Sequence, residues 1–311
     1  MRKAPSHTAA VLLAIFVTFL WSTSWVLIKI GLQNNLPPLS FAGLRYFVAF
    51  VCLIPVVLAN PRERTILRNL NRVDWGILTI FGIVMIALAQ GTQYISMDYL
   101  PTVTVSLLLN LNPIAVGFMS QIWYKERPTF MQWIGIVVSM AGTLIYFMPV
   151  NIPQAKAIGF LAAFAGILSN AYGTLLGRQT NQRSRLSPLV ITFVSMGIGS
   201  VLMLAAGWAT EGIGHPSLID WGYIAWLAIV NTAFAFTLWY HTQRTLTAVE
   251  SSLINSLMLP QIALLAFFFL GETVSIKEVV GLILVGLGVV IVQLRKQNEF
   301  QDAGLSTERS V

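Results

Sequence analysis

The chain has 311 residues, of which 56% are hydrophobic and only 10% are charged. A soluble domain carries about 25% charged residues, so this chain has too few polar side chains to cover a water-soluble fold. The formal net charge of +7 does not indicate a nucleic-acid partner, because the basic residues lie between long apolar runs. The single cysteine, Cys52, excludes a disulfide framework. Composition therefore indicates a membrane protein.

A membrane-spanning helix needs about 20 mainly apolar residues, and the chain contains ten such stretches. In chain order they are Thr8–Leu32, Leu39–Ala59, Trp75–Met97, Thr102–Trp123, Phe130–Pro149, Ala157–Gly177, Ser187–Ala209, Trp221–Thr242, Ala248–Leu270 and Ser275–Leu294. Each is predicted to be a helix, because lipid offers no hydrogen-bond partner to free backbone groups. The first stretch is too long for a cleaved signal peptide, so we interpret it as a span that is retained. Residues 297–311 are polar and are predicted to form a disordered cytoplasmic tail.

The basic residues predict the orientation of these spans. If the N-terminus lies inside, 15 of the 19 Lys and Arg residues fall in the termini and in the loops on the inner side. Cytoplasmic loops of membrane proteins carry this excess of positive charge. Both termini are therefore predicted to be cytoplasmic.

An internal repeat divides the chain into two halves. Asp74-Trp75-Gly76 opens the third stretch, and Asp220-Trp221-Gly222 opens the eighth, 146 positions later. The same offset relates five further identical pairs, which are Gly31 and Gly177, Tyr94 and Tyr240, Glu126 and Glu272, Gly135 and Gly281, and Gly142 and Gly288. The last four glycines are spaced by seven residues within each half and so share one helix face, where we expect close packing between helices.

Each copy of the repeat contains five spans, which is an odd number, so the second copy enters the membrane from the opposite side. Inverted repeats of this kind are typical of secondary transporters, whose substrate site lies near the midplane where the halves meet. We therefore predict an all-α membrane protein with ten transmembrane helices in two inverted five-helix repeats, residues 1–149 and 150–296.

Several motifs carry a family resemblance. They are Trp21-Ser22-Thr23-Ser24-Trp25 with Lys29, Pro38 with Arg45, and Pro113…Glu126…Gly135…Gly142 with its echo Pro260…Glu272…Gly281…Gly288. Up to about Gln297, the chain resembles the drug/metabolite transporter superfamily, in its ten-span branch with two EamA-type domains. Within that branch it looks most like the bacterial YddG-type exporters of aromatic and other amino acids. The resemblance implies an exporter of the bacterial inner membrane, with a central cavity between two bundles of spans.

Helix faces narrow the candidate substrate site. At about 100° per residue, polar and aromatic residues share one stripe of the first span and another of the third span. The repeat offset carries these stripes onto the sixth and eighth spans, and a proline in the fourth span frees a backbone carbonyl nearby. The predicted substrate-binding residues are Trp21, Ser24, Trp25, Gln90, Gln93, Tyr94, Asn110, Asn170, Phe236, Trp239 and Tyr240. Hydrogen bonding between helices is the alternative role for the Asn and Gln residues.

Arg45 lies within the second span, where an ionisable group is costly. Its role is either structural, as a hydrogen-bond donor to helix ends, or functional, as the partner of a substrate carboxylate. His7, His215 and His241 are isolated from one another, so neither a metal site nor a cofactor is predicted.

The remaining question is which class of membrane protein this is. A membrane-embedded enzyme is not indicated, because the sequence has no HExxH, no GxSxG and no intramembrane acid pair. A nucleotide-sugar carrier would need basic residues beyond Lys29 and Arg45 to bind phosphates.

We expect an exporter of aromatic and other amino acids that works by alternating access without proton coupling, since every carboxylate lies near a span end or outside the spans. A proton-coupled exporter of drugs or cations, from the same superfamily, remains the alternative. The expected partners are a small amino-acid-like substrate and the lipid bilayer, and the oligomeric state is left open, a monomer being compatible with the sequence.

Overall fold

Every regular element in the described part of the chain is a helix. The computed structural model describes residues 5–32, 36–100, 105, 108–123, 128–148, 157–182, 186–212, 214–270 and 275–308, and these residues contain no strand. A helix satisfies its backbone groups within one segment, which is what a chain in lipid requires.

The helices of the first half cover the predicted spans and add one short helix, α3. They are α1 (His7–Leu32), α2 (Pro38–Ala59), α3 (Pro61–Arg68), α4 (Arg72–Phe81), the π-helical segment η1 (Gly82–Leu88), α5 (Ala89–Tyr99), α7 (Asn112–Trp123) and α8 (Phe130–Phe147). The segment of α3 was expected to be a loop. It forms a helix because Asn60 caps its start, accepting a hydrogen bond from the backbone of Arg62 at 3.1 Å, and Pro61 suits the first helical position.

The second half follows the same order. It consists of α9 (Ala157–Gln182), α10 (Pro188–Thr210), α11 (Leu218–Ala228), the π-helical segment η2 (Ile229–Phe234), α12 (Ala235–Thr242), α13 (Ala248–Ser256), α14 (Met258–Leu270) and α15 (Ile276–Glu308). The predicted ninth span is divided at Leu257, three residues before Pro260, whose ring nitrogen cannot donate to the preceding turn. The last helix continues past Leu294 and takes in most of the segment predicted as a disordered tail.

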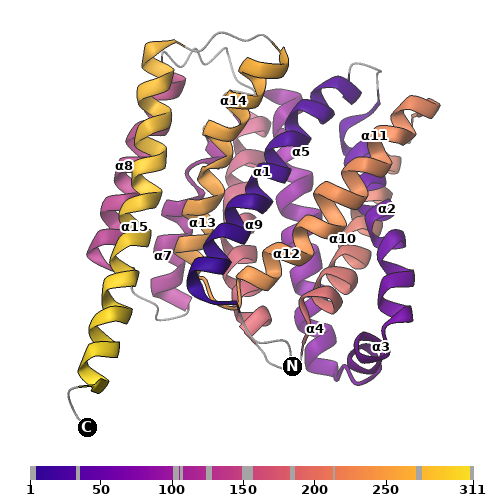
Figure 1. Cartoon of the computed structure of the whole chain (residues 1–311). Helices are drawn as coiled ribbons and strands as arrows, with labels where there is room; N and C mark the ends of the chain where they lie inside the picture. The colour runs from indigo at the N-terminus through magenta and orange to yellow at the C-terminus, as the bar shows by residue number, and fades with distance from the viewer. Residues whose placement is uncertain are drawn as a thin grey trace.

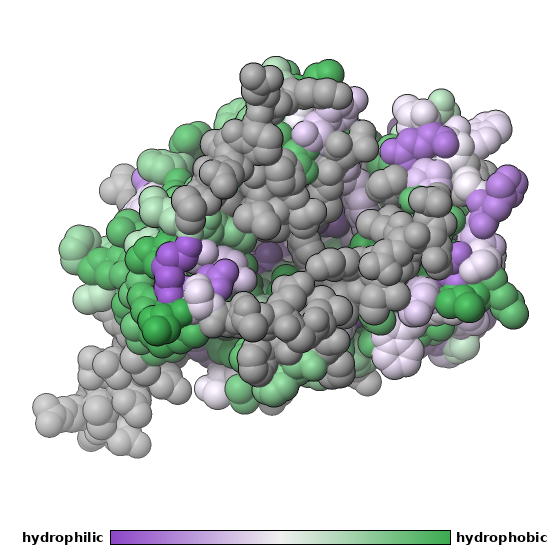
Figure 2. All heavy atoms as spheres, turned by 90° about the horizontal axis from the view of Figure 1, so that it is seen from above, coloured by the Kyte–Doolittle hydropathy of each residue, from purple (hydrophilic) through white to green (hydrophobic). Residues whose placement is uncertain are grey.

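Eight helical stretches in the described part are long and apolar enough to cross a bilayer. The predicted fourth and tenth spans are not among them, and residues 102–104 and 106–107 of the fourth lie outside the described part. Seen from above, the molecule carries hydrophobic side chains along much of its outer rim (Figure 2). Large apolar residues such as Phe16, Val56 and Phe164 are among these exposed groups. A surface of this kind suits contact with lipid.

The repeat seen in the sequence recurs in local structure. Besides the capping box of α13, four capping boxes, in which the residue before the helix and the third helical residue bond each other's backbone, open α4, α8, α11 and α15. They are formed by Asn71 with Asp74, Thr129 with Gln132, Ser217 with Asp220, and Ser275 with Glu278. The first and third of these pairs differ by 146 positions, and so do the second and fourth. The starts of the π-helical segments, Gly82 and Ile229, match this offset to within one residue.

Close backbone contacts join the two halves. Helix α8 lies against α15, and α2 lies against α10 (Figure 1). A Cβ atom built on Gly135 would lie 2.6 Å from the carbonyl oxygen of Gly288, and one built on Gly288 would lie 2.6 Å from that of Gly135. Gly142 and Gly281 make the same reciprocal contact, at 2.5 and 2.7 Å. The prediction that these glycines form a packing face is confirmed, because any side chain there would collide with backbone.

We expect Gly288→Ala to destabilise the protein by about 1–3 kcal/mol, the usual cost of overpacking a well-packed contact. Its methyl group would meet backbone atoms of α8, which cannot turn away as a flexible side chain does. The matched control is Gly286→Ala in the same helix, where nothing lies within 4 Å of the added Cβ. The measurement is the fraction of protein that stays monodisperse in detergent after heating. Because alanine favours a helix more than glycine does, a Gly288→Ala variant as stable as the Gly286→Ala variant would contradict the packing explanation.

Candidate functional site

An aromatic cluster forms where α1 meets α12. The ring of Trp21 lies 5.0 Å, centre to centre, from Phe236 and 5.0 Å from Trp239. Positions 236, 239 and 240 share one face of α12 because they are three and four residues apart, and Tyr240 lies 5.9 Å from Phe236. The sequence predicts the stripes on both helices, and the structure shows that the two stripes pack on each other.

Two further rings extend this cluster. Tyr46 of α2 lies 5.9 Å from Phe236 in an edge-to-face arrangement, and Phe81 of α4 lies 5.3 Å from Tyr240. We use the name aromatic cluster for Trp21, Tyr46, Phe81, Phe236, Trp239 and Tyr240. All are buried except Trp21, which is half-buried. Four helices from both halves of the chain thus contribute to one aromatic wall.

Arg45 adds a positive charge to this wall. Its side chain is only 5% exposed, and the guanidinium carbon lies 5.5 Å from the centre of the Tyr46 ring. Its Nε donates a 2.7 Å hydrogen bond to Thr232 Oγ1, and its Nη2 donates to the carbonyl of Asn231 at 3.5 Å. The buried side chain of Tyr94 in α5 lies within electrostatic range of the guanidinium, which brings this predicted site residue to the cluster.

Among the described residues, no ion pair is found between Arg45 and an acidic side chain. The ion pair that is found joins His7 to Glu250. A buried charge is costly unless it is paired or fully hydrogen-bonded. Hydroxyl and carbonyl dipoles carry that task here. Arg45 therefore has the structural role considered above, as a hydrogen-bond donor to a neighbouring helix. Its guanidinium nevertheless has no carboxylate partner among the described residues.

The π-helical segment η2 supplies the polar partners. The side-chain hydroxyl of Thr232 donates to the carbonyl of Leu227, five residues earlier, at 2.8 Å. Asn231 ties η2 to α1, because its side-chain amide donates to the carbonyl of Leu20 and to Thr23 Oγ1, while its own carbonyl accepts from Trp21 Nε1 at 3.0 Å. Sequence reasoning missed Asn231 and Thr232. Their signal was available, since they form an adjacent polar pair inside an apolar span.

Two buried polar atoms beside the cluster have no hydrogen-bond partner in the described part of the chain. They are the hydroxyl of Tyr240 and Oδ1 of Asn231. Buried polar atoms are nearly always hydrogen-bonded in folded proteins. An unpartnered donor and an unpartnered acceptor beside a lone guanidinium are what a small polar ligand would complete.

A second polar contact joins α7 to α13. Asn112 donates from its side-chain amide to Ser252 Oγ at 3.2 Å, and both residues are buried. Oδ1 of Asn112, Oδ1 of Asn255 and Oγ of Ser251 have no partner among the described residues. These two asparagines lie close before Pro113 and Pro260, where the sequence predicts free acceptors.

The other predicted site residues have a less direct relation to the cluster. The Ser24 hydroxyl donates to the carbonyl of Trp21 at 2.6 Å, so it is engaged within α1. The side chain of Trp25 lies outside the described part of the structure. Those of Gln90, Gln93, Asn110 and Asn170 are half-buried in α5, in the turn before α7 and in α9. No ring contact or hydrogen bond between the cluster and the side chains of Gln90, Gln93 or Asn170 is observed.

Groups of three or more His, Cys, Asp or Glu side chains that could hold a metal ion are absent from the described residues. The aromatic cluster and its neighbours offer flat apolar walls, one guanidinium, and a few hydroxyl and amide groups.

Comparison with known proteins places this arrangement in a family. The EamA-like transporter family matches residues 8–148 and 157–294. The uncharacterized transporter YvbV of Bacillus subtilis (strain 168) is 28% identical over 302 residues, covering 96% of this chain and 95% of that protein. The uncharacterized inner membrane transporter YedA of Escherichia coli (strain K12) is 24% identical over 291 residues, with 91% and 90% covered. A crystal structure of 18% sequence identity shares the fold, with a TM-score of 0.78 over 92% of this chain and 97% of that chain. This chain is a membrane transporter that belongs to the EamA-like family, within the drug/metabolite transporter superfamily.

Proposed function

We propose that the protein is a secondary transporter that exports aromatic and other amino acids across the bacterial inner membrane by alternating access. The observation that carries this proposal is the buried Arg45, without a carboxylate partner, beside the aromatic cluster. The family supports transport, and the name of the relative YedA supports the inner membrane. The amino-acid substrate rests on the chemistry of the site, and it would place the protein near the YddG-type branch.

The parts of an amino acid correspond to the groups gathered here. Aromatic walls bind apolar and aromatic side chains by burial and edge-to-face contact. A guanidinium binds a carboxylate through two parallel charge-assisted hydrogen bonds. Oδ1 of Asn231 can accept from the substrate ammonium, and the ring faces attract that cation as well. In this conformation Phe236, Trp239 and Tyr240 are at most 4% exposed, so the site is closed to solvent.

Alternating access is supported by the relation between the halves. Helices α4 and α11, which carry the two Asp-Trp-Gly motifs, lie at opposite ends of the molecule (Figure 1). The reciprocal glycine contacts of α8 with α15 are what a two-fold axis between the repeats would produce. The proposed architecture is ten spans in two inverted repeats, residues 1–149 and 150–296, with both termini cytoplasmic.

A proton-coupled exporter of drugs or cations is the second candidate, and Glu250 is the observation that favours it. This carboxylate is 1% exposed. However, its Oε2 accepts from the backbone of Thr247 at 2.7 Å, capping α13, and its Oε1 lies 3.1 Å from His7 Nε2. A carboxylate with two structural partners at a helix start is poorly placed to alternate between the two faces of the membrane.

The first prediction concerns Arg45. In liposomes, Arg45→Gln should lower the uptake of phenylalanine about 10- to 100-fold, since charge-assisted hydrogen bonds contribute about 1.5–3 kcal/mol. Arg45→Lys should recover part of this loss, because a lysine keeps the charge but not the planar fork. Phenethylamine, which lacks the carboxylate, is the matched substrate and should be affected little by either change. Equal loss for both compounds would assign Arg45 a purely structural role.

The second prediction concerns the aromatic cluster. Replacement of Trp21 or Tyr240 by Ala should reduce amino-acid transport about tenfold or more, since each removes a large apolar contact worth several kcal/mol when fully lost. The same is expected for Trp25 and Tyr94. Trp208→Ala is the control, because Trp208 is 68% exposed on the outer surface. Transport rates are compared at equal amounts of monodisperse protein, and undiminished rates in all four variants would make these residues packing groups.

The third prediction concerns energy coupling. An imposed pH gradient should not drive amino-acid accumulation above the external concentration, because every carboxylate lies near the end of a predicted span or outside the spans. Uptake into liposomes with and without the gradient measures this. Accumulation that Glu250→Gln abolishes would establish the proton-coupled alternative, with coupling through that residue.

A further inference from the structure

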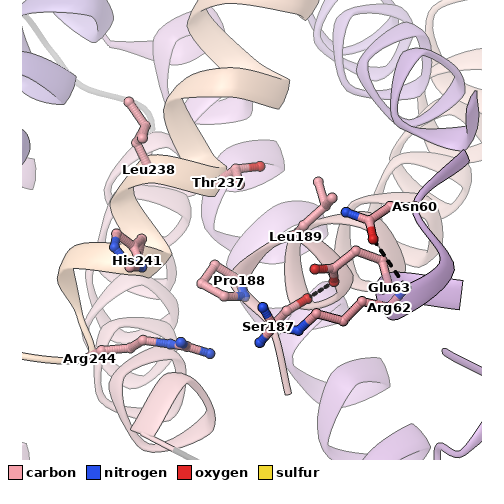
Figure 3. A pocket seen from close by; sticks show the side chains of 10 residues that line it. All are labelled: Asn60, Arg62, Glu63, Ser187, Pro188, Leu189, Thr237, Leu238, His241 and Arg244. Carbon is pink, nitrogen blue, oxygen red and sulfur yellow. Dashed lines mark hydrogen bonds between the residues drawn. The ribbon is translucent and has the colours of Figure 1, made fainter. Parts of the chain in front are cut away.

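A pocket of about 410 Å³ lies beside α3, and the α12 residues that line it differ from those that form the aromatic cluster. It lies between α3, the start of α10 and the end of α12 (Figure 3). Its polar lining consists of the hydroxyl residues Ser187 and Thr237 together with Asn60, Arg62, Glu63, His241 and Arg244. None of the predicted substrate-binding residues lines it, so it is a separate feature. On the orientation proposed above, it opens at the cytoplasmic membrane interface.

Positive charge predominates in this pocket. Arg244 directs its guanidinium toward the centre, where it meets Arg62 from α3 (Figure 3). Nη2 of Arg244 donates to the carbonyl of Leu186, whereas its Nε is buried without a hydrogen-bond partner among the described residues. Burial and the neighbouring charge of Arg62 lower the pKa of Arg244, while Glu63 raises it. Two guanidinium groups that repel each other across a cavity favour an anion between them.

The single acidic residue of the lining is already engaged. Glu63 is buried, and its carboxylate accepts a hydrogen bond from the hydroxyl of Ser187 (Figure 3). Ser187 is also the capping residue of α10, since its Oγ accepts from the backbone of Val190 at 3.1 Å. The negative charge of Glu63 is thereby held against the positive end of that helix. Two arginines against one carboxylate leave a net positive pocket, to which protonated His241 would add.

Two helix starts face the same space. Helix α3 begins beside Asn60, and α10 begins beside Ser187, and both capping residues line the pocket. The capping side chains occupy some of the free backbone donors, but the partial positive charge of each helix start remains. Leu189 and Leu238 form an apolar wall beside these polar groups.

We propose that this pocket binds a phosphate group. The two sources are the phosphodiester of an anionic phospholipid, whose first acyl carbons would lie on Leu189 and Leu238, and a free phosphate anion. Guanidinium groups match phosphate oxygens in pairs, as they match carboxylates. The bound group would touch α3 from the first half and α10 and α12 from the second, and so fasten the two halves together at this pocket.

The test uses the full-length protein, purified and delipidated in a neutral detergent. Native mass spectrometry and thermal unfolding are followed with dioleoylphosphatidylglycerol, with inorganic phosphate, and with dioleoylglycerol, which has the same acyl chains and no phosphate. We expect phosphatidylglycerol to bind and to raise the unfolding midpoint, and dioleoylglycerol to do neither. Arg62→Gln combined with Arg244→Gln should weaken binding about tenfold or more, since each charge-assisted bond is worth at least the factor of ten that 1.4 kcal/mol represents.

Arg64→Gln is the matched control. It lies on the same short helix, is exposed and does not line the pocket, so binding should be unchanged. Arg62→Gln alone keeps the test valid if loss of the Arg244 bond to Leu186 impairs folding. A response to phosphatidylglycerol alone assigns the site to a lipid headgroup, and a response to inorganic phosphate as well assigns it to phosphate in general. Binding that is equal in the Arg62 and Arg64 variants, or the absence of any response to both phosphate sources, would overturn the proposal.

Discussion

The absence of water inside a bilayer is the constraint on which this structure depends. Each polar group in a span must find a partner within the protein, and most side chains find it in their own helix. Thr143, Thr174, Thr180 and Ser195 each donate a hydroxyl to the carbonyl one turn earlier, at 2.6 to 3.0 Å. Because such a bond satisfies the hydroxyl within its own helix, these side chains can face lipid or another helix as an apolar side chain does. Helices can then pack through small residues, as α8 and α15 do.

The candidate site lies where side chains cannot find their hydrogen-bond partners within their own helix. The side chain of Arg45 carries a charge and several donors, and that of Asn231 has both donors and an acceptor. One helix cannot provide hydrogen-bond partners for all of these groups. Both form hydrogen bonds between helices, and η2 makes these possible because a π-helical turn displaces backbone and side chains from the regular register. The aromatic rings around them exclude water and strengthen each of these bonds. The same polar groups that hold α1, α2 and η2 together therefore present unpaired atoms to a ligand.

Much of the helical architecture could be predicted from the sequence, because span length and hydropathy depend on the solvent and not on the packing. The glycine contact was also predictable, since seven-residue spacing places Gly135 and Gly142 on one face. The aromatic cluster was predictable in part. Positions 236, 239 and 240 follow from helical periodicity, but their contact with Trp21 bridges more than 200 residues of sequence, and periodicity carries no information about which helices are neighbours.

The π-helical segments and α3 could not be predicted in this way. Within η2, Asn231 contacts α1 and Thr232 contacts α2, and the hydropathy of a span does not distinguish a π-helical segment from an α-helical one. Helix α3 is short and polar, so its existence depends on its cap at Asn60 and on burial of Glu63 against Ser187. The pocket that α3 helps to form could not be predicted from the sequence either. Its lining comes from three segments that lie far apart in the chain.

The repeat relates the helices of the two halves, but it does not relate the polar and aromatic residues of the candidate site. The offset of 146 positions carries Arg45 onto Ile191, Tyr46 onto Thr192, and Asn231 back onto Met85. In the alternating-access cycle proposed above, a molecule whose halves share a helical arrangement but carry a single off-axis charge would not regenerate the same site when its halves exchange conformations. The substrate would then meet a different set of contacts in each end state, and the free energies of the two states would differ even with equal substrate on both sides. A preferred resting state, and with it unequal apparent affinities at the two faces of the membrane, would follow from the absence of a matching arginine in the second copy.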